Sequence, residues 1–376
     1  MCEMVEKQAP LKSIMNSLDP KLARVFLPWA VRHPRYLFTF NRLIQSYRKT
    51  KKTREDAKLN GLVVPPFLIV SITSQCNLSC AGCYAAAVGT TKAKVPPLGM
   101  DRWRQIIAEA SEVGVFGFVI AGGEPFLFPG LLELCGDFND RFFIIVTNGT
   151  AITEDDFKRL KRLSNVAVLV SIEGGPDATD ARRGSGVYER VSETLRRLLK
   201  SGVLAGISVT VNRLNHEYWM GGEELDRFIE MGVKIGVFIE HIPVAAGPVG
   251  SDDRQLVLTK EERERFRSWV LDLRATRPIY LVHSPGDEEF FGGCVSAGRG
   301  FAHVTPAGDL TPCPVSNVAT HNLTTSTLRE GLASQLFKEI RESEHLLENS
   351  GSPCALFSHP KEVEELAKAV GAYRTS

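Results

Sequence analysis

The chain has 376 residues, of which 43% are hydrophobic and 24% are charged, and its formal net charge is +1. This composition is ordinary for a folded protein with one large domain and a smaller one, and the near-zero charge argues against a nucleic-acid partner. Eight irregularly spaced cysteines do not form a secreted disulfide scaffold, and no window is apolar enough for a transmembrane helix. Because the N-terminus also lacks a signal-peptide core, we expect a cytoplasmic protein.

Residues 1–60 are predicted to form a basic helical segment. Twelve Lys or Arg stand against three acidic residues over residues 11–58. The spacing of apolar residues predicts a helix over 20–32, kinked or broken at Pro28, and a second helix that begins near Arg35.

Two interpretations of this helical segment are open. In one, its apolar stripe packs on the domain that follows and the basic tract at residues 49–54 is a solvated linker. In the other, its aromatic residues Phe26, Trp29 and Phe38 lie on an anionic membrane, which would make the protein peripheral on the inner face of the membrane.

From residue 61 the pattern changes to alternating strands and helices, which predicts a parallel sheet with crossover helices. Ligand groups in such folds gather where the strands end. Cys135, within an apolar helical stretch, is predicted to be a core thiol. The expected strands are 67–73, 116–121, 142–147, 166–172, 206–212 and 235–242, and the expected helices lie near 101–113, 129–137, 153–163, 187–201 and 222–231.

Three cysteines follow the first predicted strand at the spacing C-x3-C-x2-C: Cys76, Cys80 and Cys83. Iron–sulfur clusters are normally held by four thiolates, so three would leave one iron of a cubane cluster open to another ligand. The alternatives are a zinc site or plain core thiols. Structural zinc usually needs a fourth cysteine or histidine, and none lies nearby in the sequence.

This spacing, its aromatic follower Tyr84, and the Gly-Gly-Glu-Pro sequence at 122–125 resemble the radical S-adenosylmethionine (radical SAM) superfamily. The resemblance implies a (β/α)6 core and a [4Fe–4S] cluster on the three thiolates, with Tyr84 beside it. The open iron would chelate the amino and carboxylate groups of SAM. An electron from a low-potential donor such as ferredoxin or flavodoxin would then split SAM into methionine and a 5′-deoxyadenosyl radical.

The same resemblance assigns roles to residues that end the next strands. Gly122, Gly123 and Glu124 would contact the SAM amino group, and Thr147 and Asn148 would line the same opening. The remaining expected SAM contacts are Ser171 and Glu173 near the ribose, Arg182 or Arg183 at the carboxylate, and Asn212 at the nucleoside. Many relatives carry Asp at the position of Glu173, and a solvated loop is the alternative for each arginine.

The C-terminal part contains a second set of cysteines. Cys294 and Cys313 belong to a C-x13-G-x4-C phrase that resembles the opening of the SPASM/twitch extension, and Cys354 follows. The resemblance implies one auxiliary [4Fe–4S] cluster, whose fourth site would be filled by substrate or by a residue such as His303, Asp309 or His321. The alternative is three unrelated buried thiols.

The rest of the C-terminal part has a predictable local structure. Residues 244–258 are expected to form a long connection, followed by a helix over 259–275 with a capping box at its start. A hairpin turn is expected over 305–309, and helices are expected near 325–341 and 360–370.

Together these features predict an α/β partial (β/α)6 barrel over residues 61–245, preceded by the helical segment 1–60 and followed by a smaller α+β auxiliary-cluster domain over 246–376. The predicted activity is hydrogen abstraction from a lipid or isoprenoid, a peptide or a small metabolite. An electron-transfer or cluster-carrier protein is the alternative, although it would not need the strand-end motifs. A zinc-stabilised α/β binding protein is a third hypothesis.

Overall fold

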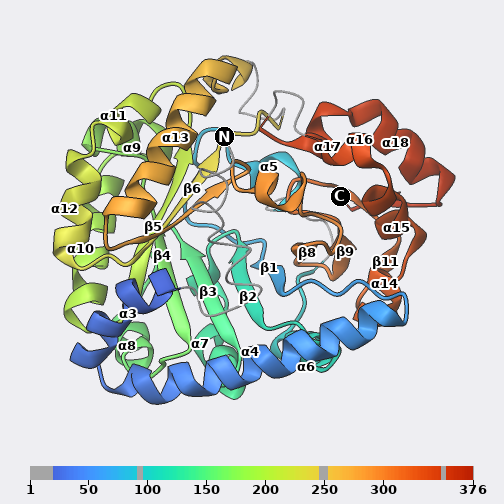
Figure 1. The fold of residues 1–376 in the computed structure, drawn as a ribbon, viewed down its shortest axis with the longest axis horizontal. Helices are drawn as coiled ribbons and strands as arrows, with labels where there is room; N and C mark the ends of the chain where they lie inside the picture. The colour runs from blue at the N-terminus through green and yellow to red at the C-terminus, as the bar shows by residue number, and fades with distance from the viewer. Residues whose placement is uncertain (1–19, 91–95, 245–252, 349–352, 376) are drawn as a thin grey trace.

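Seven consecutive parallel strands, β1 to β7, form one side of a ten-stranded sheet (Figure 1). The computed structural model describes residues 20–90, 96–244, 253–348 and 353–375. The first six strands lie where the alternation predicted them, so the α/β partial-barrel fold is confirmed. The strands are β1 (Phe67–Thr73), β2 (Gly117–Gly122), β3 (Phe142–Thr147), β4 (Val166–Ser171), β5 (Leu204–Val211), β6 (Ile235–Glu240) and β7 (Tyr280–Ser284).

Crossover helices connect these strands, and their apolar faces complete a core built from the alternate residues of each strand. Two of these helices begin with a capping box: Thr153 pairs with Asp156 at the N-terminus of α8 (Glu154–Leu160), and Thr259 pairs with Glu262 at the N-terminus of α13 (Lys260–Thr276). Cys135 is fully buried in this core, as predicted. The helices are α6 (Met100–Val113), α7 (Leu131–Asp137), α8 (Glu154–Leu160), α10 (Val187–Lys200), α12 (Glu223–Met231) and α13 (Lys260–Thr276), with short helices α5 (Tyr84–Ala87), η2 (Pro125–Leu127), α9 (Pro176–Arg183) and α11 (His216–Met220) in the loops.

The seventh strand, β7, was not predicted. It has only five residues and includes a buried histidine, so it lacks the long apolar run that marks the other strands. β7 pairs in parallel with β6 and lies beyond residue 245, so the barrel sheet crosses the expected domain boundary. Part of the connection expected over 244–258 lies outside the described residues; its last part contains η3 (Asp253–Leu256).

The two N-terminal helices, α3 (Pro20–Arg32) and α4 (Arg35–Leu59), close the amino-terminal end of the barrel. The ring centroids of Trp29 and Tyr36 lie 4.3 Å apart with the rings tilted by 58°, and both side chains are buried against residues of β3 to β6. Tyr36 accepts a hydrogen bond from the Leu204 amide at the start of β5. The break expected at Pro28 does not occur, because this proline lies on the exposed face, where water can satisfy the carbonyl that loses its partner.

The C-terminal part continues the same sheet. Strand β8 (Phe301–Val304) pairs in parallel with β1 and forms the predicted hairpin with β9 (Asp309–Thr311), whose turn contains Gly308 at φ +94°. The helices gather on one side of the molecule (Figure 1), and the stretch near 325–341 is two helices because Ser334 caps a new one. The elements are η4 (Glu288–Phe291), β10 (Val318–Ala319), β11 (His321–Asn322), α14 (Leu328–Leu332), α15 (Gln335–Glu342), α16 (Glu344–Leu347), α17 (Ala355–Ser358), α18 (Pro360–Ala369) and β12 (Tyr373–Arg374). Within the described residues, no helix has the length and hydropathy to cross a membrane.

Candidate active site

Cys76, Cys80 and Cys83 lie on the loop that leaves β1 and leads into α5. Partial burial raises the pKa of Cys76, and the charges of Glu124 and of the other two thiols act in the same direction. Burial also raises the pKa of Cys80, against the opposing effect of Arg183 and Arg182. The three sulfurs are therefore electrostatic neighbours, and a bound cation would favour their thiolate forms.

Thiolates are the donors that hold an iron–sulfur cluster. Among the described residues, no group of three Cys, His, Asp or Glu side chains is close enough to hold one metal ion. A four-iron cluster is larger than an ion, so its thiolates lie further apart. Cys76 is exposed and the other two thiols are partly exposed, which leaves them accessible to a cluster.

The loop after β2 approaches the cysteine loop so closely that it requires glycine. The amides of Gly123 and Glu124 donate to the carbonyls of Thr73 and Gln75, at 2.8 and 2.7 Å. A Cβ atom on Gly123 would lie 2.0 Å from the Gln75 carbonyl oxygen, and one on Gly122, at φ +122°, would lie 2.5 Å from that of Thr73.

Glu124 joins this loop to the end of β3. Its fully buried carboxylate accepts hydrogen bonds from the Thr147 hydroxyl at 2.7 Å and from the Asn148 amide at 2.8 Å. Burial raises the pKa of Glu124, although these donors oppose the shift. The side-chain nitrogen of Asn148 in turn reaches Asn77 at 2.9 Å and the Cys76 sulfur at 4.0 Å. These hydrogen bonds therefore connect the carboxyl ends of β1, β2 and β3 at the loop that carries the cysteines.

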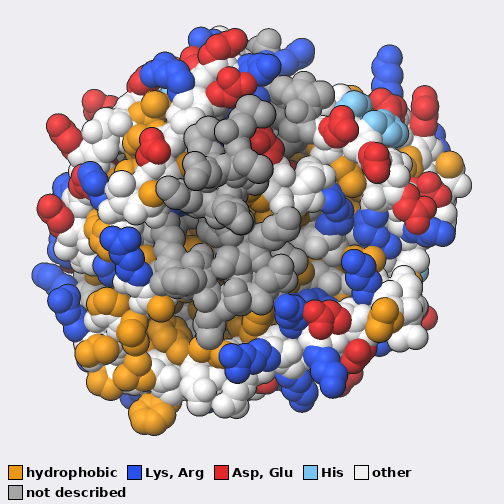
Figure 2. Space-filling model, viewed as in Figure 1, with side chains coloured by type: hydrophobic (Ala, Val, Ile, Leu, Met, Phe, Trp, Pro, Cys, Tyr) orange, Lys and Arg blue, Asp and Glu red, His pale blue; other side chains and the backbone are white. Residues whose placement is uncertain are grey.

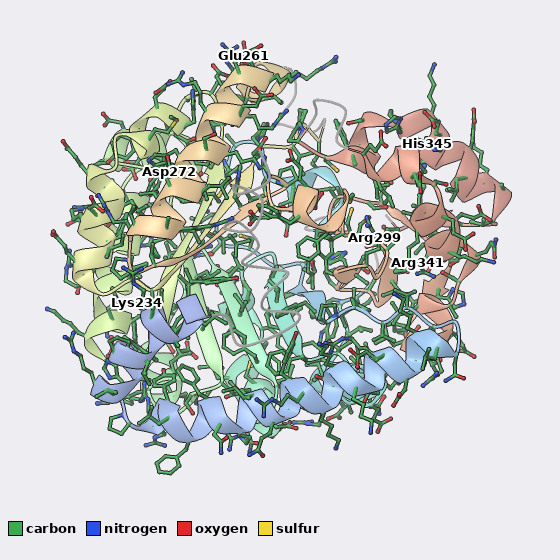
Figure 3. All side chains as sticks on the ribbon, in the orientation of Figure 1. Lys234, Glu261, Asp272, Arg299, Arg341 and His345 are labelled. Carbon is green, nitrogen blue, oxygen red and sulfur yellow. The ribbon has the colours of Figure 1, made fainter. Side chains whose placement is uncertain are left out.

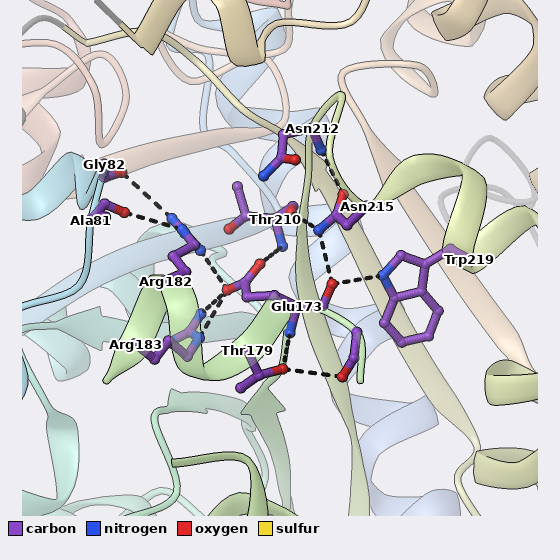
Figure 4. A network of polar contacts seen from close by, with 11 residues as sticks. Ala81, Gly82, Glu173, Thr179, Arg182, Arg183, Thr210, Asn212, Asn215 and Trp219 are labelled. Atoms are coloured by element: carbon purple, nitrogen blue, oxygen red, sulfur yellow. Dashed lines mark hydrogen bonds and ion pairs between the residues drawn. The ribbon is translucent and has the colours of Figure 1, made fainter. Parts of the chain in front are cut away.

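Glu173, just after β4, is the centre of a second buried network (Figure 4). Arg182 and Arg183 each approach its Oε1 atom at 2.5 Å. Burial alone would raise the pKa of Glu173, but the two guanidinium groups hold it below its ordinary value. Both arginines, predicted at the SAM carboxylate, are thus bound to the glutamate predicted near the ribose.

Arg182 also holds the cysteine loop from the other side. Its Nε donates to the Ala81 carbonyl at 3.2 Å, and its own carbonyl accepts from the Ala81 amide at 2.9 Å. Ala81 lies between Cys80 and Cys83, so α9 fixes the middle of the cysteine motif. The sequence offered no signal for this contact, because the two segments are about a hundred residues apart.

The other predicted site residues lie at or after the carboxyl ends of the same strands. Ser171 and Asn212 are buried at the ends of β4 and β5, and the Asn212 side chain accepts from the Leu214 amide at 2.8 Å. Burial raises the pKa of Tyr84 at the start of α5. Sequence reasoning missed the residues that support Glu173, namely Thr179, Thr210, Asn215 and Trp219 (Figure 4).

Comparison with known proteins decides the family. Residues 70–234 match the family model described as the radical SAM superfamily. This range contains the cysteine loop and every strand-end motif described above. This part of the chain belongs to the radical SAM superfamily. A radical SAM enzyme uses a [4Fe–4S] cluster and SAM, so the predicted primary cofactors are confirmed.

Several named proteins resemble this chain beyond that range. The AdoMet-dependent heme synthase of Methanosarcina barkeri is 25% identical, covering 75% of this chain and 86% of the relative. The mycofactocin maturase MftC of Mycobacterium tuberculosis is 28% identical, with 75% and 74% covered. The PqqA peptide cyclase of Rhizobium meliloti is 27% identical, with 76% and 77% covered.

The crystal structure of Streptococcus suis SuiB bound to its precursor peptide SuiA has the same fold. Its TM-score is 0.64 at 18% identity, and the match covers 80% of this chain and 72% of SuiB. A match of this extent includes the C-terminal part as well as the radical SAM barrel.

The second set of thiols also comes together. Burial raises the pKa of Cys294 to about 12 and that of Cys354 to about 11, and it raises the pKa of Cys313 well above its ordinary value. The charges of Cys294 and Cys354 both act on Cys313. Three sulfurs from distant segments therefore share one buried place, where a cationic cluster would stabilise their thiolates.

Backbone contacts and two arginines hold this triad. The Cys294 amide donates to the Leu347 carbonyl at 2.7 Å, and Cys354 caps α17. Arg299 and Arg341, labelled in Figure 3, donate to the carbonyls of Phe291 and Ala297 at 2.8 and 3.0 Å. The segment that carries Cys294 is thus fixed on both sides.

The three residues proposed from sequence as a fourth ligand have other contacts. His303 bonds Ser71 and Thr311, at 2.8 Å each, and Asp309 accepts from Tyr373 at 2.7 Å. His321 contacts the Thr320 hydroxyl at 3.0 Å. The carboxylate whose charge acts on both Cys294 and Cys354 is instead that of Glu288, a buried residue in η4 that sequence reasoning missed.

A further buried polar group lies at the ends of β6 and β7, where no site residue was predicted. Glu240 binds Arg263 at 2.5 Å and lies 3.2 Å from the Nε2 atom of His283. Both Glu240 and His283 are almost fully buried. An acidic residue that ends an apolar strand was the one available signal for this group.

Proposed function

We propose that Cys76, Cys80 and Cys83 hold the [4Fe–4S] cluster of this radical SAM enzyme. The observation that carries the proposal is the convergence of the cysteine loop with two independent networks, one centred on Glu124 and one on Glu173. A cluster carrier would need neither. When bound, the cluster and SAM supply one electron and a carbon radical to the site.

The surrounding residues bind and orient SAM. The backbone of Gly122 and Gly123 and the side chain of Glu124 present acceptors for the SAM ammonium group. Arg182 and Arg183 bring positive charge to the place where the SAM carboxylate would lie, and Glu173 keeps both guanidinium groups in position. Tyr84, Thr147, Asn148, Ser171 and Asn212 complete the rim of the opening.

We propose that Cys294, Cys313 and Cys354 hold one auxiliary [4Fe–4S] cluster, with Glu288 as the fourth ligand. The Gly293 amide donates to the Glu288 carbonyl at 3.1 Å, so η4 is folded directly onto the cysteine that follows. Ligand exchange from Glu288 to substrate would then be open to this cluster. The division at residue 245 separates the two cluster sites, although the sheet is shared.

A peptide is the substrate class that the relatives favour. The PqqA peptide cyclase and SuiB with its precursor peptide both carry peptides in their names, whereas the heme synthase points to a tetrapyrrole. Ferredoxin or flavodoxin would deliver the electron. The proposed cofactor residues lie at the carboxyl ends of the strands, whereas α3 packs at the amino ends, so a substrate would approach from the end opposite α3.

The experiment uses deuterated extracts of a host culture, separated into peptide, lipid and tetrapyrrole fractions. The anaerobically loaded, reduced enzyme receives SAM and one fraction, and mass spectrometry follows deuterium in 5′-deoxyadenosine. Deuterium from the peptide fraction supports the proposal. Deuterium from either other fraction would overturn the peptide assignment and leave the radical SAM activity intact.

A further inference from the structure

An exposed apolar patch lies on the helical turn between α3 and α4. Leu27, Val31, Leu37 and Phe38 are 54%, 61%, 41% and 83% exposed. Among the described residues, nine large hydrophobic side chains are exposed, and four of them lie in this one stretch. Figure 2 shows hydrophobic side chains gathered at the lower left, where Figure 1 places α3 and the start of α4. Such a concentration is characteristic of a binding surface.

The core does not account for this patch. The inner faces of the two helices, with Trp29, Ala30 and Tyr36, already fill the end of the barrel. Leu27 and Val31 are four residues apart on the opposite face of α3, and Phe38 points away from the buried Tyr36 and Thr39. The inner face therefore packs on the barrel, as the first interpretation expected, although the basic tract 49–54 belongs to α4 and is not a linker. The outer face is exposed.

Basic side chains lie beside the patch and continue along α4 away from it. Residues 20–58 contain eleven Lys or Arg and only two acidic residues, while the whole chain carries a net charge of +1. Arg35 and Arg54 bind backbone carbonyls of the barrel. The exposed cations are Arg24 and Arg32 in α3, and Arg42, Arg48, Lys49, Lys52 and Lys58 in α4.

We propose that this patch binds the surface of an anionic lipid bilayer. Leu27, Val31 and Phe38 would enter the boundary between headgroups and acyl chains, and the basic residues would contact anionic headgroups. A second copy of the chain is a poorer occupant, because a symmetric dimer would bring two strongly basic segments face to face. The turn is held by Arg35, which donates to the Gly202 carbonyl at 2.6 Å, so the apolar side chains are presented on a fixed support.

This attachment orients the enzyme. Arg35 binds Gly202, and Tyr36 binds Leu204, both at the amino end of β5. The cysteine loop and the Glu124 and Glu173 networks lie at the carboxyl ends of the strands. The bilayer would thus contact the end of the barrel opposite the cofactor opening, which would face water. The proposal goes beyond the radical SAM activity and does not depend on it.

The test is flotation of the full-length, anaerobically loaded protein with vesicles of phosphatidylglycerol and phosphatidylcholine, and with vesicles of phosphatidylcholine alone. We expect binding to the anionic vesicles at low salt and weaker binding at high salt. The Leu27→Ser/Val31→Ser/Phe38→Ser variant should bind at least about tenfold more weakly. Leu214→Ser is the matched control, because Leu214 is 80% exposed on another part of the surface.

Three results would overturn the proposal. The wild-type protein could fail to float with anionic vesicles at low salt. The triple variant could bind as tightly as wild type, which would show adsorption of the basic residues without insertion of the apolar ones. Light scattering could show a dimer that the triple substitution dissociates, which would make a second copy the occupant.

Discussion

Arg183 and Glu173 form a buried ion pair, with Nη2 and Oε1 2.5 Å apart, and Arg182 approaches the same oxygen atom. Two cations therefore share one carboxylate beside the cysteine loop. Although burial disfavours the charge of Arg183, the charge of Glu173 raises the pKa of this arginine above its ordinary value. The network fixes the arginines before any ligand is bound.

Glu173→Gln should destabilise the protein strongly. The substitution leaves two buried guanidinium groups without their counter-charge, a change that typically costs about 3–5 kcal/mol. Urea denaturation of the wild-type and variant proteins measures the difference. The control is Asp155→Asn, which removes an exposed pair with Arg159 of 2.6 Å and should cost less than about 1 kcal/mol. Equal effects of the two substitutions would show that the Glu173 network does not stabilise the fold.

Gly123→Ala should reduce retention of the primary cluster. A methyl group there would lie 2.0 Å from the Gln75 carbonyl, so the cysteine loop would have to move. Iron and sulfide analysis after anaerobic gel filtration measures the loss. Gly99→Ala is the control, since a Cβ atom there meets nothing within 4 Å. Full iron content in the Gly123→Ala protein would contradict the close packing of the two loops.

Two clusters should be separable by substitution. We expect about eight irons in the wild-type protein and about four after Cys76→Ala/Cys80→Ala/Cys83→Ala, because each cubane contains four. The Cys294→Ala/Cys313→Ala/Cys354→Ala variant should also retain about four. No iron in the first variant would show that the buried triad holds no cluster.

Glu288→Gln should change the electron paramagnetic resonance spectrum of the auxiliary cluster. The measurement is made in the variant that lacks the first three cysteines, so that only one cluster contributes. Glu289→Gln is the control, because the neighbouring Glu289 is exposed and pairs with Arg267 at 2.8 Å. An unchanged spectrum in the Glu288→Gln protein would exclude this residue as a ligand.

His303 should make the protein less stable in acid. Burial lowers the pKa of His303 to about 3, whereas in the unfolded chain it is about 6.5. Below about pH 6.5 the unfolded chain binds a proton that the folded protein excludes, so stability falls as the pH decreases toward 3. This site should cost about 2 kcal/mol between pH 7 and pH 5.

The His303→Gln protein tests this expectation. Its overall stability should be lower, since His303 bonds Ser71 and Thr311, but the acid-dependent loss between pH 7 and pH 5 should be smaller. Urea denaturation at both pH values gives the two losses. If wild type and variant lose the same stability, another group is responsible.

The sequence predicted the parts of this fold that depend on local patterns. The spacing of apolar residues predicted six strands and their crossover helices. The C-x3-C-x2-C spacing after the first strand predicted a loop with three candidate cluster ligands. The strand β7 was missed because five residues that include a histidine carry too little apolar signal. The clamp of Arg182 on Ala81 joins residues far apart in the chain, which no local pattern encodes.

The sequence predicted which strand ends carry the site residues. It did not predict which of these residues bind one another. Arg182, Arg183 and Glu173 were each assigned to SAM, yet they bind one another in the structure. For the auxiliary triad, spacing joined Cys294 to Cys313 only. Cys354 and Glu288 come to the same place through η4 and α17, whose packing the sequence does not show.

The most direct test of the central claim is the cleavage of SAM by the anaerobically reconstituted and reduced protein, measured as 5′-deoxyadenosine over time. We predict its formation by the wild-type protein and its absence with Cys80→Ala. A fully loaded and reduced wild-type protein that forms no 5′-deoxyadenosine, or a Cys80→Ala protein that forms it at the wild-type rate, would contradict the account.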